Sequence, residues 1–202
     1  MTKVKLCGLS RPEDIETANE LLPDYIGFVL VPASRRYVAP ERAARLRAHL
    51  SSRIRAVGVF ADEEPEKVAA LCRRGLIDLI QLHGREDEEY LDRLRRLTQT
   101  PVIQAYRIRD AECMDRALRS SAEMILLDAG AGEGLRFDWS LLKGIRRPYF
   151  LAGGLDPSNV AGAIGKLAPY AVDVSSGIET GGKKDRKKMH AFVRAVREET
   201  VQ

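Results

Sequence analysis

The chain has 202 residues, of which 45% are hydrophobic and 31% charged, the balance of an ordinary soluble globular protein. Its formal net charge of +4 favours anionic ligands but is too small to indicate a nucleic-acid partner. The three cysteines show no paired spacing, and no apolar stretch is long enough for a signal peptide or a membrane span. We therefore expect a cytoplasmic protein without a disulfide framework or a membrane partner.

Short apolar runs alternate with amphipathic segments along the whole chain. The runs are rich in Val, Ile and Leu, as buried parallel strands are. They predict strands at residues 4–7, 25–30, 54–60, 79–83, 101–106, 124–128, 149–154 and 170–177. No Ser/Gly linker, low-complexity run or break in this rhythm marks a boundary, so residues 1–202 are predicted to form one domain.

The amphipathic segments carry helix-start signals. Ser10 and Glu13 match a capping box, and Pro12 fits the first turn of the helix that follows. Asp156 is expected to cap a helix in the same way. The last predicted helix covers residues 185–199.

Alternating strands and helices are compatible with two architectures. A doubly wound open sheet usually has about five or six strands, whereas eight strands without a leftover segment favour a closed (β/α)8 TIM barrel. The chemistry of such barrels gathers at the C-terminal ends of the strands. Cys7 ends the first run, His83 the fourth and Asp128 the sixth. The sequence therefore predicts a single-domain TIM barrel of the α/β class with its site at that face.

Seven motifs follow one another along these strands: KLCG, GFVLVPASRRYV, VGVF, QLHG, LLD…FDWSLL, LAGGL and DVSSGIE. Together they closely resemble the phosphoribosylanthranilate isomerase family, from residue 3 to about residue 190. The resemblance implies an isomerase without cofactor or metal. It would convert N-(5-phosphoribosyl)anthranilate to 1-(2-carboxyphenylamino)-1-deoxyribulose 5-phosphate in tryptophan biosynthesis. One departure is the loop after Asp128, which is shorter than usual, so its ordering over the substrate is left open.

The resemblance implies an acid and a base, because this rearrangement protonates the ribose ring oxygen and removes a proton from the neighbouring carbon. The family assigns the base to Cys7 and the acid to Asp128. A thiol with a pKa of ~8.5 is mostly protonated at neutral pH, so we expect Lys5, two residues back on the same strand face, to stabilise the thiolate. Asp128 needs a pKa well above ~3.9, which desolvation would supply. We expect Cys72 and Cys113 to be structural.

The substrate's two ends need separate binding groups. The phosphate is expected at the loops after the last two strands, at Gly153, Gly154, Ser176 and Gly177. Glycines allow an oxyanion to approach backbone N–H groups closely. Arg36 is the expected partner of the anthranilate carboxylate. Asp173 is expected near the ribose hydroxyls and His83 at the barrel mouth, either as a substrate contact or as a structural hydrogen-bond donor.

Other functions remain as alternatives. The basic run KKDRKK at residues 183–188 is compatible with nucleic-acid binding, but no aromatic residue interleaves it, and a solvated helix face is favoured. The enzymatic alternative is another phosphosugar isomerase or epimerase. A metal-dependent epimerase would need a ligand cluster that the scattered His49, His83 and His190 do not offer. A Schiff-base aldolase would need a lysine at a strand end, whereas Lys5 lies a layer too deep. The expected partner is a small molecule, and the expected assembly a monomer or a homodimer.

Overall fold

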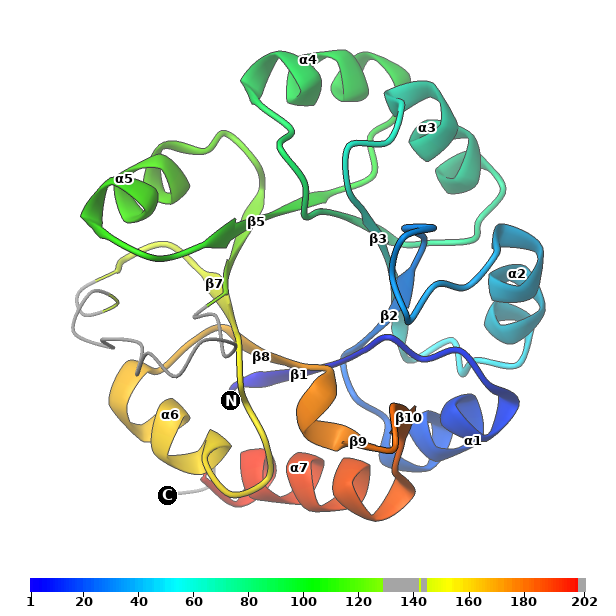
Figure 1. The fold of residues 1–202 in the computed structure, drawn as a ribbon, viewed down its shortest axis with the longest axis vertical. Helices are drawn as coiled ribbons and strands as arrows, with labels where there is room; N and C mark the ends of the chain where they lie inside the picture. Colours follow the sequence, from blue (N-terminus) through cyan, green and yellow to red (C-terminus); the bar gives the residue numbers. More distant parts are fainter. Residues whose placement is uncertain (129–141, 143–144, 200–202) are drawn as a thin grey trace.

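The computed structural model describes residues 1–128, 142 and 145–199. Its principal strands are β1 Lys3–Cys7, β2 Tyr25–Val29, β3 Arg55–Phe60, β4 Leu79–Leu82, β5 Val102–Arg107, β6 Met124–Asp128, β7 Tyr149–Ala152 and β8 Ala171–Val174. These strands pair in parallel and in sequence order, and β1 also pairs with β8, so the sheet closes on itself (Figure 1). The predicted TIM barrel is confirmed.

The helices form a ring outside the barrel (Figure 1). They are α1 Pro12–Leu21, α2 Pro40–Ala48, α3 Pro65–Arg73, α4 Glu88–Leu97, α5 Ala111–Arg119, α6 Val160–Leu167 and α7 Arg186–Glu199. Within the described part of the chain, none of them combines the length and the apolar character needed to cross a bilayer.

Alternation along the strands creates two cores, because successive side chains point to opposite faces. One set, which includes Leu6 and Phe28, packs beneath the helices. The other set fills the inside of the barrel with Tyr25, Val57, Leu79, Ile103, Leu126, Phe150 and Ala171. The same alternation turns Cys7 of β1, Asp128 of β6 and Asp173 of β8 toward the inside. These polar side chains therefore lie in or above the barrel core.

The predicted cap of the first helix is wrong by one residue. Arg11, not Ser10, is the N-cap, and the carboxylate of Asp14 accepts hydrogen bonds from the backbone N–H groups of Ser10 (2.9 Å) and Arg11 (3.0 Å). Pro12 occupies the first helical position, as predicted. The cause is that Asp14 reaches back over the N-terminus and replaces Glu13 in the box.

The chain leaves the last two strands earlier than predicted. Gly153 (φ 93°) and Gly154 (φ 64°) adopt left-handed backbone conformations that end β7, and β8 ends at Val174. Asp156 lies in the turn before α6, whose N-cap is Asn159 rather than Asp156. Asp156 still organises this helix start, because its carboxylate accepts the backbone N–H of Asn159 at 3.2 Å.

A short hairpin follows β8 and lies beside α1 and α7 in Figure 1. It consists of a 3-10 turn, η2 Ser176–Ile178, and the antiparallel strands β9 Glu179–Thr180 and β10 Lys183–Lys184. The two residues between these strands, Gly181 (φ 58°) and Gly182 (φ 76°), both have positive φ, as a type I′ turn requires. The hairpin brings part of the basic run back toward the barrel mouth.

Candidate active site

The barrel brings together two of the predicted reactive side chains, His83 and Asp128. His83 follows β4 directly and Asp128 ends β6, and their Nε2 and Oδ2 atoms lie 3.6 Å apart. The side chain of His83 is 34% exposed and that of Asp128 19%, so both are accessible from the mouth. This pair places a carboxyl group next to an imidazole.

Cys7 is more buried than His83 and Asp128, and its neighbours leave a space, the socket, that the thiol occupies. The residue is only 7% exposed, and Val29 and Val59 pack beside it. Gly27 is paired with Cys7 across β1 and β2, and a β-carbon at Gly27 would lie 2.7 Å from the Cys7 sulfur. Sequence reasoning missed Gly27, although a glycine inside an apolar strand is a signal of close approach.

The groups around Cys7 shift the pKa of its thiol in opposite directions. Burial raises the pKa of the Cys7 thiol, and Lys5 opposes this rise. Asp173 adds to the rise, and Lys184 opposes it. Lys5 therefore acts in the predicted direction, but desolvation outweighs it, and the net pKa of Cys7 in the ligand-free protein lies above the ordinary value. Lys5 itself stays charged: burial disfavours the ammonium, but Asp173 and Cys7 raise its pKa.

Asp173 and Gln81 each carry a buried polar atom that lacks a partner within the described structure. Asp173 accepts a hydrogen bond from Lys5 through Oδ2 (2.9 Å), and its Oδ1 is unpaired. Gln81 has an unpaired Oε1, and its Nε2 lies 3.5 Å from Nδ1 of His83. A buried acceptor without a donor is costly, so both oxygens fit hydroxyl groups of a bound molecule. Gln81 lies in the QLHG motif, but sequence reasoning singled out only the histidine.

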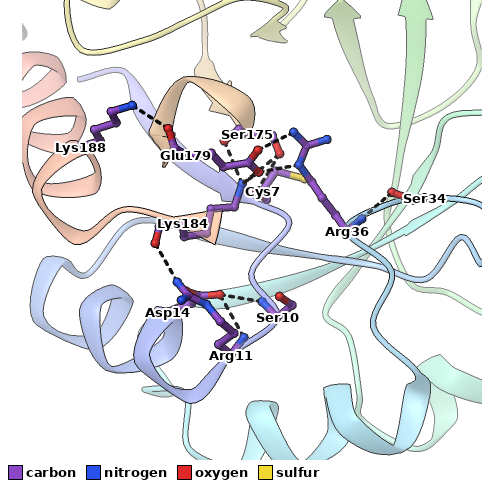
Figure 2. A network of polar contacts seen from close by, with 10 residues as sticks. All are labelled: Cys7, Ser10, Arg11, Asp14, Ser34, Arg36, Ser175, Glu179, Lys184 and Lys188. Atoms are coloured by element: carbon purple, nitrogen blue, oxygen red, sulfur yellow. Dashed lines mark hydrogen bonds and ion pairs between the residues drawn. The ribbon is translucent and has the colours of Figure 1, made fainter. Parts of the chain in front are cut away.

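Arg36 is held by a carboxylate that the sequence analysis did not single out. Its Nε and Nη2 donate to the two oxygens of Glu179, at 2.6 and 2.8 Å. Lys184 donates to the same Glu179 carboxylate at 2.7 Å and to the carbonyl oxygen of Ser175 at 2.8 Å. Figure 2 shows these side chains converging beside Cys7. The mouth therefore has a cationic edge that a single carboxylate organises.

The basic run is solvated only in part. Lys183, Lys187 and Lys188 are exposed, as a solvated face requires. Lys184 is 7% exposed, so the interpretation is wrong for this residue. The reason is the hairpin, in which Lys184 lies directly opposite Glu179 and turns toward the mouth.

The two predicted phosphate loops lie against each other. A β-carbon at Gly177 would overlap the carbonyl oxygen of Leu155, so the η2 turn packs directly on the chain that follows Gly154. Asn159 donates to the carbonyl oxygen of Gly154 at 2.8 Å and fixes this loop. Gly154 and Ser176 are exposed. The two loops therefore meet at one exposed junction.

The other two cysteines lie away from the mouth, and the loop after Asp128 lies outside the described residues. Cys72 of α3 and Cys113 of α5 are half-buried on the outer helices, and all three cysteines are free. The described residues contain no group of three or more His, Cys, Asp or Glu side chains that could hold a metal ion. The loop after Asp128, whose ordering was left open, lies at residues 129–141, outside the described residues.

Comparisons with known proteins agree along the whole chain. A family model described as N-(5'phosphoribosyl)anthranilate (PRA) isomerase matches residues 4–195. The N-(5'-phosphoribosyl)anthranilate isomerase of Endomicrobium trichonymphae is 42% identical over 202 residues, covering 98% of this chain and 99% of the relative.

Two solved structures extend this likeness to the fold. One is a phosphoribosyl anthranilate isomerase in complex with reduced 1-(o-carboxyphenylamino)-1-deoxyribulose 5-phosphate; it is 38% identical, with a TM-score of 0.88, covering 98% of this chain and 100% of that one. The other contains monomers generated from the dimeric phosphoribosylanthranilate isomerase of Thermotoga maritima. It is also 38% identical, with a TM-score of 0.87 and the same coverage.

Proposed function

The chain belongs to the N-(5'-phosphoribosyl)anthranilate isomerase family, and from this premise we propose which of its residues carry the reaction. The enzyme converts N-(5-phosphoribosyl)anthranilate to 1-(2-carboxyphenylamino)-1-deoxyribulose 5-phosphate in tryptophan biosynthesis. We assign the acid to Asp128, the base to Cys7, and the two substrate ends to Arg36 and the phosphate loops.

In the first step, the Asp128 carboxyl group donates its proton to the ribose ring oxygen. The bond between that oxygen and C1 breaks, and the lone pair of the anthranilate nitrogen forms a C=N bond to C1. The Cys7 thiolate then takes the proton from C2, and the C–H electron pair becomes a C1=C2 bond while the nitrogen regains its lone pair. The resulting enol-amine tautomerises to the ketone. We expect the unpaired oxygens of Asp173 and Gln81 to accept hydrogen bonds from the sugar hydroxyls.

The observation that supports this assignment most is the socket of Cys7. Val29 and Val59 pack beside this thiol as in an ordinary core, but Gly27 and the buried ammonium of Lys5 also border it. Turnover is tested by the loss of the substrate's fluorescence in the presence of purified enzyme. We expect turnover without any added metal or cofactor, and a dependence on Cys7 that is developed in the Discussion.

Arg36 is expected to bind the anthranilate carboxylate equally in the ground and transition states. Arg36→Met should therefore raise KM by about 10–100-fold, the value of a charge-assisted hydrogen bond. It should leave kcat within a few-fold on the high-pH plateau of the pH profile, where loss of a cation near Cys7 no longer limits ionisation of the thiol. Steady-state kinetics measure both constants. Arg35→Met is the matched control, because Arg35 is exposed beside it. A fall in kcat at unchanged KM in Arg36→Met would contradict the anchoring role.

Inorganic phosphate is expected to compete with the substrate at the junction of the two loops. Gly154→Val should abolish this competition, because a branched side chain would fill the space of the oxyanion. Valine at positive φ also costs about 1–2 kcal/mol. Gly75→Val is therefore the control, since Gly75 (φ 67°) follows α3 and has the same backbone demand with nothing near its β-carbon position. Inhibition constants for phosphate decide the test, and competition that survives in Gly154→Val would refute the site.

Two further proposals concern the cellular location and the oligomeric state of the protein. We propose a cytoplasmic location, which the three free cysteines support, because thiols persist in reducing compartments. We also propose a monomer or a homodimer, and the dimeric Thermotoga maritima relative supports the second state. Sedimentation of the purified enzyme distinguishes the two.

A further inference from the structure

Lys184 is a buried ammonium that the acid–base chemistry leaves without a role. Its side chain is 2% exposed, and burying a long charged side chain is unfavourable unless it is paired. Burial lowers the pKa of Lys184, and Glu179 opposes this change. The neighbouring Lys183, on the same hairpin, is exposed. Of these two adjacent lysines of the basic run, Lys184 is therefore buried in the barrel mouth, whereas Lys183 is exposed to solvent.

The hairpin positions Lys184 with little freedom. The type I′ turn fixes the register that sets Lys184 opposite Glu179. The guanidinium of Arg11 donates to the backbone carbonyl oxygen of Lys184 at 2.7 Å, so β10 is also held from α1. The Lys184 ammonium then donates to three oxygens, two on Ser175 and one on Glu179. Such a saturated ammonium is well fixed in position.

These contacts lead directly to the first strand. The Ser175 hydroxyl accepts from Lys184 (3.1 Å) and donates to the carbonyl oxygen of Cys7 (3.1 Å). A β-carbon at Gly8 would lie 3.4 Å from Nζ of Lys184 and 3.2 Å from Oγ of Ser175. The ammonium therefore sits against the backbone that carries Cys7, as the close-up in Figure 2 makes visible.

The charges around Cys7 indicate what this contact between Lys184 and the Cys7 backbone could do. Three cations face the thiol: Lys5, Arg36 and Lys184. Two carboxylates accompany them, since Asp173 pairs with Lys5, and Glu179 is shared by Arg36 and Lys184. One positive charge is left over, and ionisation of Cys7 would neutralise it.

We propose that Lys184 is a positioning residue of the isomerase: it ties Ser175 to the Cys7 backbone and leaves the net positive charge that a Cys7 thiolate requires. Glu179 keeps Lys184 and Arg36 in one arrangement, so the base and the carboxylate anchor share a support. This inference rests on the assignment of Cys7 as the base. It concerns a residue outside the acid–base pair and outside the substrate anchors.

The test measures ionisation of Cys7 separately from turnover. In a Cys72→Ser/Cys113→Ser background, thiolate absorbance titrates Cys7 alone, and the pH profile of kcat reports the base in the enzyme–substrate complex. Lys184→Met should move the thiol titration and the rising limb of the profile to higher pH by roughly one unit, because loss of a nearby cation disfavours the thiolate. Lys183→Met is the matched control and should move neither.

Two further variants complete the design. Lys184→Arg keeps the charge and should restore most of the thiol titration. Lys184→Gln removes the charge but keeps a hydrogen-bond donor, so it should give the same shift as methionine and serves if Lys184→Met does not fold. An activity loss that is uniform in pH, with an unmoved thiol titration, would overturn the proposal. A shifted titration with an unmoved kcat profile would instead show that Cys7 is not the base.

Discussion

Cys7→Ser is expected to lower kcat by a factor of about 10²–10⁴ or more, the contribution typical of a general base. A serine hydroxyl is nearly isosteric with the thiol, so it should fit the socket beside Gly27 and keep the barrel folded. Its pKa lies far above that of any thiol, so it cannot take a proton from C2 near neutral pH. Fluorescence of the substrate measures the loss, and binding of the product shows that the site is intact.

Cys72→Ser is the control for this change. Cys72 is half-buried on α3 and distant from the mouth, so turnover should stay within a few-fold of the parent. Equal activity of the Cys7→Ser enzyme and the parent would remove the base from this position. A second check is pH: because burial raises the pKa of Cys7, the parent's kcat/KM should still be rising with pH at neutrality.

The barrel and the location of Cys7, His83 and Asp128 at one end of it could be predicted, because both depend on local pattern. Apolar runs at regular spacing give parallel strands, and closure of the sheet then brings the ends of β1, β4 and β6 to one face whatever their distance in sequence. The location of these three side chains could be predicted from one fact, namely that each stands at the end of a predicted strand. The resemblance to a family supplied their chemical roles.

The cationic edge could not be predicted, because it depends on pairing rather than on pattern. β9 and β10 are two residues long, too short to show a strand period, and the lysine that they bury lies in a run of charges. The overlooked signal was the Gly181–Gly182 pair, which is typical of a tight hairpin. Once that turn is recognised, its register places Lys184 opposite Glu179.

The role of Gly27 was hidden for a similar reason. Its absent β-carbon matters only because β1 and β2 pair with Cys7 opposite it. A one-residue slip would set another side chain against the thiol. Register between strands is a property of the assembled sheet, so the sequence of one strand does not reveal it. The displaced cap of α1 is the same kind of error on a smaller scale, since Asp14 and Glu13 are both acidic and adjacent.

Asp128→Asn is expected to be as damaging as loss of the base, with kcat lower by a factor of about 10²–10⁴. The amide keeps the size and the hydrogen-bonding capacity of the carboxyl group, so the mouth and the neighbouring His83 should stay in place. It has no acidic proton to give to the ribose ring oxygen, and ring opening then depends on water.

The measurement that isolates this step compares Asp128→Asn with two other variants. Asp115→Asn, on the exposed face of α5, is the matched control and should leave kcat unchanged. His83→Gln distinguishes the donor, because the imidazole lies only 3.6 Å from the carboxylate. If His83 gave the proton, its loss would equal or exceed that of Asp128→Asn. We expect a smaller loss in His83→Gln, since an imidazole beside the acid orients it without being consumed in the step.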